Sequence, residues 1–145
     1  MLLLTLFVVA ALLNAFGQRP STTSASGQGA SLQVDAPKRL RGGLLFQARF
    51  RFRSRVGISK PVLVLDPGWQ ESMTLNSTEP AATDEGIRAG GLEFEFAPLP
   101  AGKQFTFWTE WQVNPTNLGR HDEDVALYDG DHLLTRLDRT VTVFP

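Results

Sequence analysis

Strict alternation of apolar and polar residues is the feature of this chain that most limits its fold. In residues 45–55, Phe46, Phe50 and Phe52 fall on one side and the arginines between them fall on the other. A period of two places successive side chains on opposite faces of a β-strand. No stretch after Leu32 keeps the 3.6-residue period of an amphipathic helix. The alternation therefore predicts an all-β fold.

Further short apolar or alternating runs extend this pattern to the end of the chain. They lie at residues 31–35, 62–65, 73–77, 92–96, 105–113, 123–128 and 133–144. A polar loop is expected at 80–90, and Asp129-Gly130 is a strong hairpin signal. Short strands at this spacing predict an immunoglobulin-like Greek-key β-sandwich of seven to eight strands.

Two rows of charge suggest which strands are neighbours. Arg49, Arg51 and Arg53 share one face of their strand, and Glu93 and Glu95 share one face of theirs. In an immunoglobulin-like sandwich the second strand pairs with the fifth. The arginine strand is the second predicted strand, and the glutamate strand is the fifth if 73–77 is counted as a strand. We therefore expect antiparallel pairing, with each pair of opposite charges contributing roughly 0.2–1 kcal/mol.

The first sixteen residues are uncharged and almost wholly apolar. In a helix they would reach about 24 Å, whereas a spanning helix needs roughly 20 residues. The segment is short for an anchor and suits a signal peptide, although no Lys or Arg precedes it. The alternative is a helix buried in the core, since a helix that faced solvent would need a polar face, which the segment lacks. We favour an uncleaved signal anchor or transmembrane helix at 1–17 over a signal peptide cleaved after Gly17.

Composition divides the remaining chain and bounds its chemistry. Residues 18–31 are rich in Ser, Thr and Gly and predict a flexible linker, with the sandwich at 32–145. The absence of Cys excludes disulfides and thiolate sites, and a net charge of −1 gives no reason to expect nucleic acid as a partner. We expect no cofactor and a domain held by its apolar core alone.

Catalytic and metal-binding patterns are weak. His121 and His132 lie among acidic residues, but Asp129 and Asp131 flank a glycine where turns favour Asp. The twelve-residue calcium loop and the serine nucleophile elbow are both missing from the sequence. Carboxylates two residues apart on a strand lie about 7 Å apart, which suits glycoside chemistry, but the arginine strand explains Glu93 and Glu95 better. We therefore expect no enzyme and no metal site.

Two tryptophans are the candidate binding residues. Trp108 is expected to point outward from strand 105–113, whereas Trp111 points inward, and Trp69 follows a Pro-Gly turn. Large exposed aromatic side chains are typical of binding surfaces. The alternative is that a loop covers each indole ring.

The arginine row is the second candidate. Arg49, Arg51 and Arg53 could contact a phosphate-bearing lipid, a teichoic-type polymer or an acidic partner. The alternative, which we favour, is that the row only pairs with Glu93 and Glu95.

Three segments carry a family resemblance: LPAGKQFTF at 99–107, VNPTNLGR at 113–120 and VALYDGD at 125–131. They resemble the corner, loop and final hairpin of bacterial extracytoplasmic immunoglobulin-like modules of the CARDB-like type. The whole chain resembles uncharacterised membrane-anchored actinobacterial proteins with one such domain. The resemblance implies an adhesion, scaffold or partner-binding role without catalysis, and a single copy argues against a filament or stalk.

Two functions follow as hypotheses. The first is a binding or scaffold module at the outer face of the cell membrane that engages another envelope protein, and it predicts a flat patch bounded by a sheet edge. The second is a carbohydrate- or cell-wall-binding module that uses Trp69 and Trp108, and it predicts a groove with a ring lying open along it.

Overall fold

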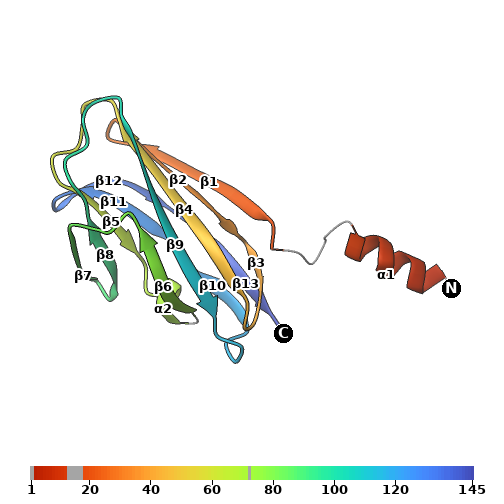
Figure 1. The fold of residues 1–145 in the computed structure, drawn as a ribbon. Helices are drawn as coiled ribbons and strands as arrows, with labels where there is room; N and C mark the ends of the chain where they lie inside the picture. Colours follow the sequence, from red (N-terminus) through yellow and green to blue (C-terminus); the bar gives the residue numbers. More distant parts are fainter. Residues whose placement is uncertain (1, 13–17, 72) are drawn as a thin grey trace.

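The computed structural model describes residues 2–12, 18–71 and 73–145, and these residues form an all-β sandwich preceded by a helix (Figure 1). The elements are α1 (Leu2–Leu12), β1 (Pro20–Gly27), β2 (Ala30–Pro37), β3 (Arg39–Arg41), β4 (Leu45–Ser54), β5 (Pro61–Leu65), α2 (Gly68–Glu71), β6 (Met73–Glu79), β7 (Asp84–Arg88), β8 (Gly91–Glu95), β9 (Gln104–Val113), β10 (Gly119–Asp122), β11 (Val125–Asp129), β12 (His132–Leu137) and β13 (Thr140–Phe144). The all-β prediction is confirmed, but the described residues form thirteen strands where the sequence predicted seven to eight.

The strands form three sheets. The first has the order β1-β2-β4-β9-β6, the second β12-β11-β5-β8-β7, and a small third sheet has the order β10-β13-β3. Every pairing is antiparallel except that of β13 with β3. The predicted hairpin at Asp129-Gly130 is confirmed, because Asp129 lies opposite His132.

Aromatic side chains from the two large sheets meet in one core. Phe50 and Phe107 come from the first sheet and Phe94 from the second, and the rings of Phe94 and Phe107 lie 5.0 Å apart. The alternation in β4 explains this arrangement, since every second residue faces the other sheet. The expected burial of Phe46, Phe50, Phe52, Phe94 and Phe96 is confirmed.

The expected pairing of the arginine strand with the glutamate strand is wrong. β4 pairs with β2 and β9, whereas β8 pairs with β5 and β7 in the opposite sheet. The alternation requires only that the apolar faces of the two strands share a core. Strands in two facing sheets meet this requirement as well as neighbouring strands of one sheet do. The charge ladder between the two rows therefore does not exist.

The linker prediction for 18–31 is wrong for most of its length. Residues Pro20–Gly27 form β1, which pairs with β2 from Pro20 opposite Pro37 to Gly27 opposite Ala30. Gln28 and Gly29 form the turn with positive φ angles of 49° and 74°. As an edge strand, β1 needs no apolar run, so its Ser- and Thr-rich sequence resembles that of a linker. The predicted polar loop at 80–90 likewise contains an edge strand, β7.

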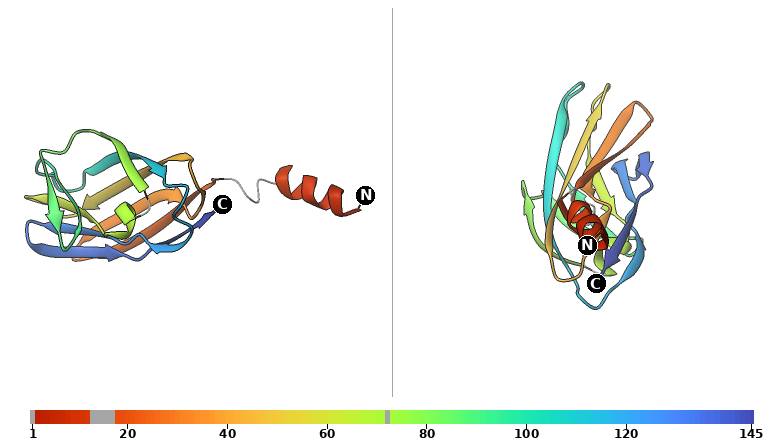
Figure 2. Two further views of the ribbon diagram at one scale, coloured as in Figure 1. Left: turned by 90° about the horizontal axis from the view of Figure 1, so that it is seen from below. Right: turned by 90° about the vertical axis from the view of Figure 1, so that its right-hand side faces the viewer.

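The N-terminal helix α1 lies beyond one end of the sandwich, the end at which the C-terminus also lies (Figures 1 and 2). Its eleven residues correspond to about 16 Å of helix, against the roughly 30 Å of a bilayer core. In the described ranges no helix is long and apolar enough to cross a membrane, so the predicted transmembrane helix at 1–17 is not supported. Residues 13–17 of that prediction lie outside the described residues.

Candidate binding surface

The solvent-facing side of the first sheet brings together four of the five predicted binding residues. Directly opposite residues on neighbouring strands share a face, and Arg49 lies between Asp35 of β2 and Trp108 of β9. The next row places Arg51 between Gln33 and Thr106. We call the outward side chains of Gln33, Asp35, Arg49, Arg51, Arg53, Thr106 and Trp108 the arginine–tryptophan face.

Asp35 holds two of the arginines in place. Its Oδ2 accepts hydrogen bonds of 2.8 Å from both Arg49 Nε and Arg51 Nη2, and its Oδ1 accepts one of 2.6 Å from Thr22 Oγ1 of β1. Burial alone would raise the pKa of the Asp35 carboxyl, but the hydrogen bonds from Thr22 and Arg49 and the charges of Arg51 and Arg49 outweigh it and lower that pKa. The carboxylate therefore stays ionised and fixes both guanidinium groups on the face.

Trp108 points outward, as predicted, and 39% of its surface is exposed. The Arg49 guanidinium carbon lies 5.2 Å from the ring centroid and covers the ring. Such a contact contributes about 0.5–1 kcal/mol at an exposed site. The indole is thus held by Arg49, which Asp35 holds in turn. Trp111, three residues further along the strand, is fully buried as predicted.

The prediction of an exposed Trp69 is wrong, because the structure buries this residue completely. Its ring lies 5.5 Å from that of Phe50 and 5.3 Å from that of Trp111. The Pro-Gly turn continues into α2, where Gly68 packs so closely on β10 that a Cβ would lie 1.6 Å from the Asp122 carbonyl oxygen. This close contact turns Trp69 into the core, and Trp69 cannot serve as a surface for a ligand.

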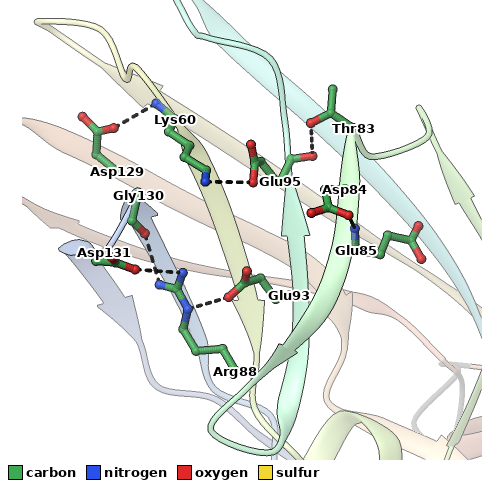
Figure 3. A network of polar contacts seen from close by, with 10 residues as sticks. All are labelled: Lys60, Thr83, Asp84, Glu85, Arg88, Glu93, Glu95, Asp129, Gly130 and Asp131. Atoms are coloured by element: carbon green, nitrogen blue, oxygen red, sulfur yellow. Dashed lines mark hydrogen bonds and ion pairs between the residues drawn. The ribbon is translucent and has the colours of Figure 1, made fainter.

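Glu93 and Glu95 find their partners within the second sheet (Figure 3). Arg88 Nε lies 2.5 Å from Glu93 Oε2, and Lys60 Nζ lies 3.3 Å from Glu95 Oε2. The Arg88 guanidinium also lies 4.6 Å from the ring centroid of Tyr128. Glu93 and Glu95 therefore pair with Arg88 and Lys60, whereas Asp35 pairs with Arg49 and Arg51.

Arg53 differs from Arg49 and Arg51. It is exposed, and within the described part of the chain it has no ion-pair partner. With Arg55 it lines a hollow of about 570 Å³ beside the β1–β2 turn. Trp108 is not among the residues that line this hollow, so its ring does not lie along a groove there.

The acidic cluster does not form a metal site. Among the described residues, no group of three His, Asp or Glu side chains is placed to hold a metal ion. His121 lies on β10 and His132 on β12. Asp129 Oδ1 accepts a 2.9 Å hydrogen bond from the Lys60 backbone N–H, which is a structural role at the turn.

A buried ion pair that no sequence pattern indicated lies beside the end of β2. Arg139 pairs with Glu123 and donates hydrogen bonds of 2.8 and 2.6 Å to the carbonyl oxygens of Ala36 and Pro37. Burial raises the pKa of Glu123 to about 7, and the charge of Arg139 offsets burial only in part. Arg139 also lies over the ring of Trp69, so the pair joins β2, α2 and the β12–β13 connection.

Comparison with known proteins supports the fold and leaves the function open. No known family model matches the chain, and no curated protein matches it. A cohesin module from a Clostridium perfringens family 33 glycoside hydrolase has a TM-score of 0.54 at 12% identity, over 82% of this chain and 98% of that one. The C-terminal domain of Wzt has a TM-score of 0.53 at 15% identity, over 89% of this chain and 81% of that one.

A CARDB domain from the PF1109 protein of Pyrococcus furiosus also matches, with a TM-score of 0.48 at 12% identity over 87% of this chain and 96% of that one. At these identities the similarity shows the fold alone. The chain is an all-β sandwich whose fold is similar to that of the cohesin module.

Proposed function

We propose that this protein is a non-catalytic binding or scaffold module that engages another protein of the cell envelope through the arginine–tryptophan face. Trp108 carries the proposal, because it is a large aromatic side chain held in place on the solvent-facing side of a sheet. Arg and Trp are the side chains most enriched at the energetic centres of protein interfaces. The ion pairs with Asp35 fix the arginines before binding, which lowers the entropy lost on association.

The alternative, a carbohydrate- or cell-wall-binding module, has less support. It relied on two open tryptophan rings, but Trp69 is buried and Arg49 covers the ring of Trp108. A sugar chain would need a groove, and Trp108 does not line the hollow beside the β1–β2 turn.

We further propose that the apolar N-terminal segment attaches the module to the outer face of the cell membrane. The side chains of Leu2, Leu3, Leu4, Leu6 and Phe7 are exposed on α1. An apolar helix surface of this kind is unfavourable in water and favourable in lipid.

The test is a pull-down of the full chain from crosslinked envelope of its source organism, comparing Trp108→Ala with Leu133→Ala. Leu133 is a matched control, since it is 43% exposed and lies on the outward side of the second sheet beside Tyr128. We expect Trp108→Ala to lower recovery of a specific partner about tenfold or more, the effect of losing a central interface residue, while Leu133→Ala recovers it as the parent does. Equal recovery with both variants would refute the proposal.

A further inference from the structure

The small third sheet presents a row of arginines to solvent. Arg120 of β10 and Arg39 of β3 lie on either side of Thr142 in β13, and Arg41 lies opposite Phe144. The alternate residues of β3 and β13 are buried, so Arg39, Arg41 and Phe144 point outward, and Arg120 of β10 is itself exposed. Within the described residues none of the three arginines has an ion-pair partner. We call Arg39, Arg41, Arg120 and Phe144 the basic end face.

Few negative charges offset this face. Asp122 is the single acidic residue in the sequences of the three strands. It lies opposite Thr140, in the row furthest from Phe144. The basic end face therefore has a net positive charge that favours an anionic partner.

Large apolar side chains stand among the arginines. Phe144 is 47% exposed, and Leu118, which directly precedes β10, is 46% exposed. Leu44 is 45% exposed, and its backbone N–H lies 3.4 Å from the Arg41 carbonyl oxygen, which places it beside the same face. Cations mixed with exposed apolar side chains match a lipid surface, where charged head groups overlie an apolar layer.

The basic end face lies where the N-terminal segment joins the sandwich. Pro20, the first residue of β1, is paired with Pro37, two residues before Arg39. Figures 1 and 2 show α1 beyond the end of the sandwich at which the C-terminus also lies. A membrane that holds the apolar α1 would therefore lie near the arginines.

We propose that the basic end face binds the surface of a bilayer that contains anionic phospholipid and so adds to the attachment through α1. This inference rests on the proposed membrane attachment. An arginine near an anionic bilayer surface contributes about 1 kcal/mol, and 1.4 kcal/mol is a factor of ten, so three arginines contribute roughly 100-fold in partitioning. Exposed Phe144 and Leu118 favour a bilayer over an acidic protein.

The experiment measures flotation of the full chain with two kinds of vesicle, phosphatidylcholine alone and phosphatidylcholine with phosphatidylglycerol. The test variant combines Arg39→Gln, Arg41→Gln and Arg120→Gln. The control removes the same charge at the opposite end of the sandwich, by Arg55→Gln, Lys60→Gln and Lys103→Gln. A thermal unfolding curve for each variant checks that the domain remains folded.

We expect the test variant to lose roughly 100-fold in partitioning to the anionic vesicles and to bind the neutral vesicles as the parent does. The control should bind both as the parent does. Unchanged anionic binding by the test variant, or an equal loss in both variants, would overturn the inference. If the parent does not bind neutral vesicles, attachment through α1 fails, and an arginine-dependent preference for anionic vesicles would still support the basic end face.

Discussion

Trp108 and Trp111 belong to one strand, three residues apart, and differ in what surrounds their indole rings. Trp111 is buried against Trp69, and its Nε1 donates a 2.7 Å hydrogen bond to Thr109 Oγ1. Trp108 contacts solvent and Arg49. One tryptophan therefore supports the fold, and the other is available to a partner.

Replacing each of these tryptophans by alanine should separate stability from binding. We expect Trp111→Ala to lower the free energy of unfolding by about 3–5 kcal/mol, because it leaves a large cavity in the core. Trp108→Ala should cost less than about 1 kcal/mol, the usual range for a surface change. Chemical denaturation measures both values. Similar losses from the two changes would mean that the two faces of β9 are wrongly assigned.

Two acidic residues should give the stability of the domain opposite responses to pH. The pKa of Asp35 is lowered in the folded state, so its contribution is present above its ordinary value of 3.8 and is lost as the pH falls through the lowered pKa. The pKa of Glu123 is raised from 4.5 to about 7, so its contribution is present below pH 4.5 and is lost as the pH rises through about 7.

We therefore expect maximal stability in mildly acidic solution, with a decline toward neutral pH of at most about 3 kcal/mol. Glu123→Gln should flatten the decline on the neutral side, and Asp35→Asn should flatten the decline in strong acid. Unfolding by urea over a pH series measures these slopes, and parallel curves for parent and variants would contradict both assignments.

At the scale of elements, β1 links the N-terminal segment to the sandwich. Its Thr22 hydroxyl completes the hydrogen bonds of Asp35, and Gly27 lies against the Leu134 backbone of β12. β1 thus covers the edge of β2 and contributes directly to the arginine–tryptophan face.

Truncation tests whether β1 is a strand of the domain. A chain that starts at Gln18 should unfold cooperatively with the stability of the parent domain. A chain that starts at Gly29 lacks β1 and should lose about 2 kcal/mol or more, because the β1–β2 ladder and the Thr22 hydrogen bond are gone. Calorimetry compares the two, and equal stability would show that residues 18–28 act as a linker.

Local patterns explain which elements the sequence could predict. Alternation in β4, β8 and β9 sets the inward faces, so the buried phenylalanines and the outward Trp108 were predictable. The edge strands β1 and β7 carry no apolar periodicity, and none of their residues is fully buried. Their formation depends on pairing with β2 and β8, a tertiary effect that short-range sequence does not encode.

At the scale of the whole molecule, the sheet in which a strand lies depends on contacts far apart in the sequence. A signal for Asp35 was present, since the alternation of 31–35 points it outward one strand before the arginines. For Trp69 no comparable signal existed, because its burial depends on packing between α2 and β10. The outward residues of the arginine–tryptophan face were therefore predictable, whereas the burial of Trp69 was not.

The two large sheets differ in how their outer faces are built, and this difference underlies the proposed function. On the second sheet, Arg88 pairs with Glu93 and Lys60 pairs with Glu95. Val62 and Val64 belong to a small buried apolar cluster of the same sheet. On the first sheet, Asp35 pairs with two arginines and leaves Trp108 exposed beside them. We therefore expect the molecule to bind its partner through one sheet only.

Position-specific photo-crosslinking in the envelope tests this one-sided binding most directly. A photoreactive residue is placed at Gln47, which is exposed beside the row of Arg49 and Trp108, or at Leu133 on the second sheet. We expect a discrete crosslinked protein from position 47, absent from position 133 and lost when Trp108→Ala is added. Equal crosslinking from both positions, or a product from position 47 that survives Trp108→Ala, would contradict one-sided binding.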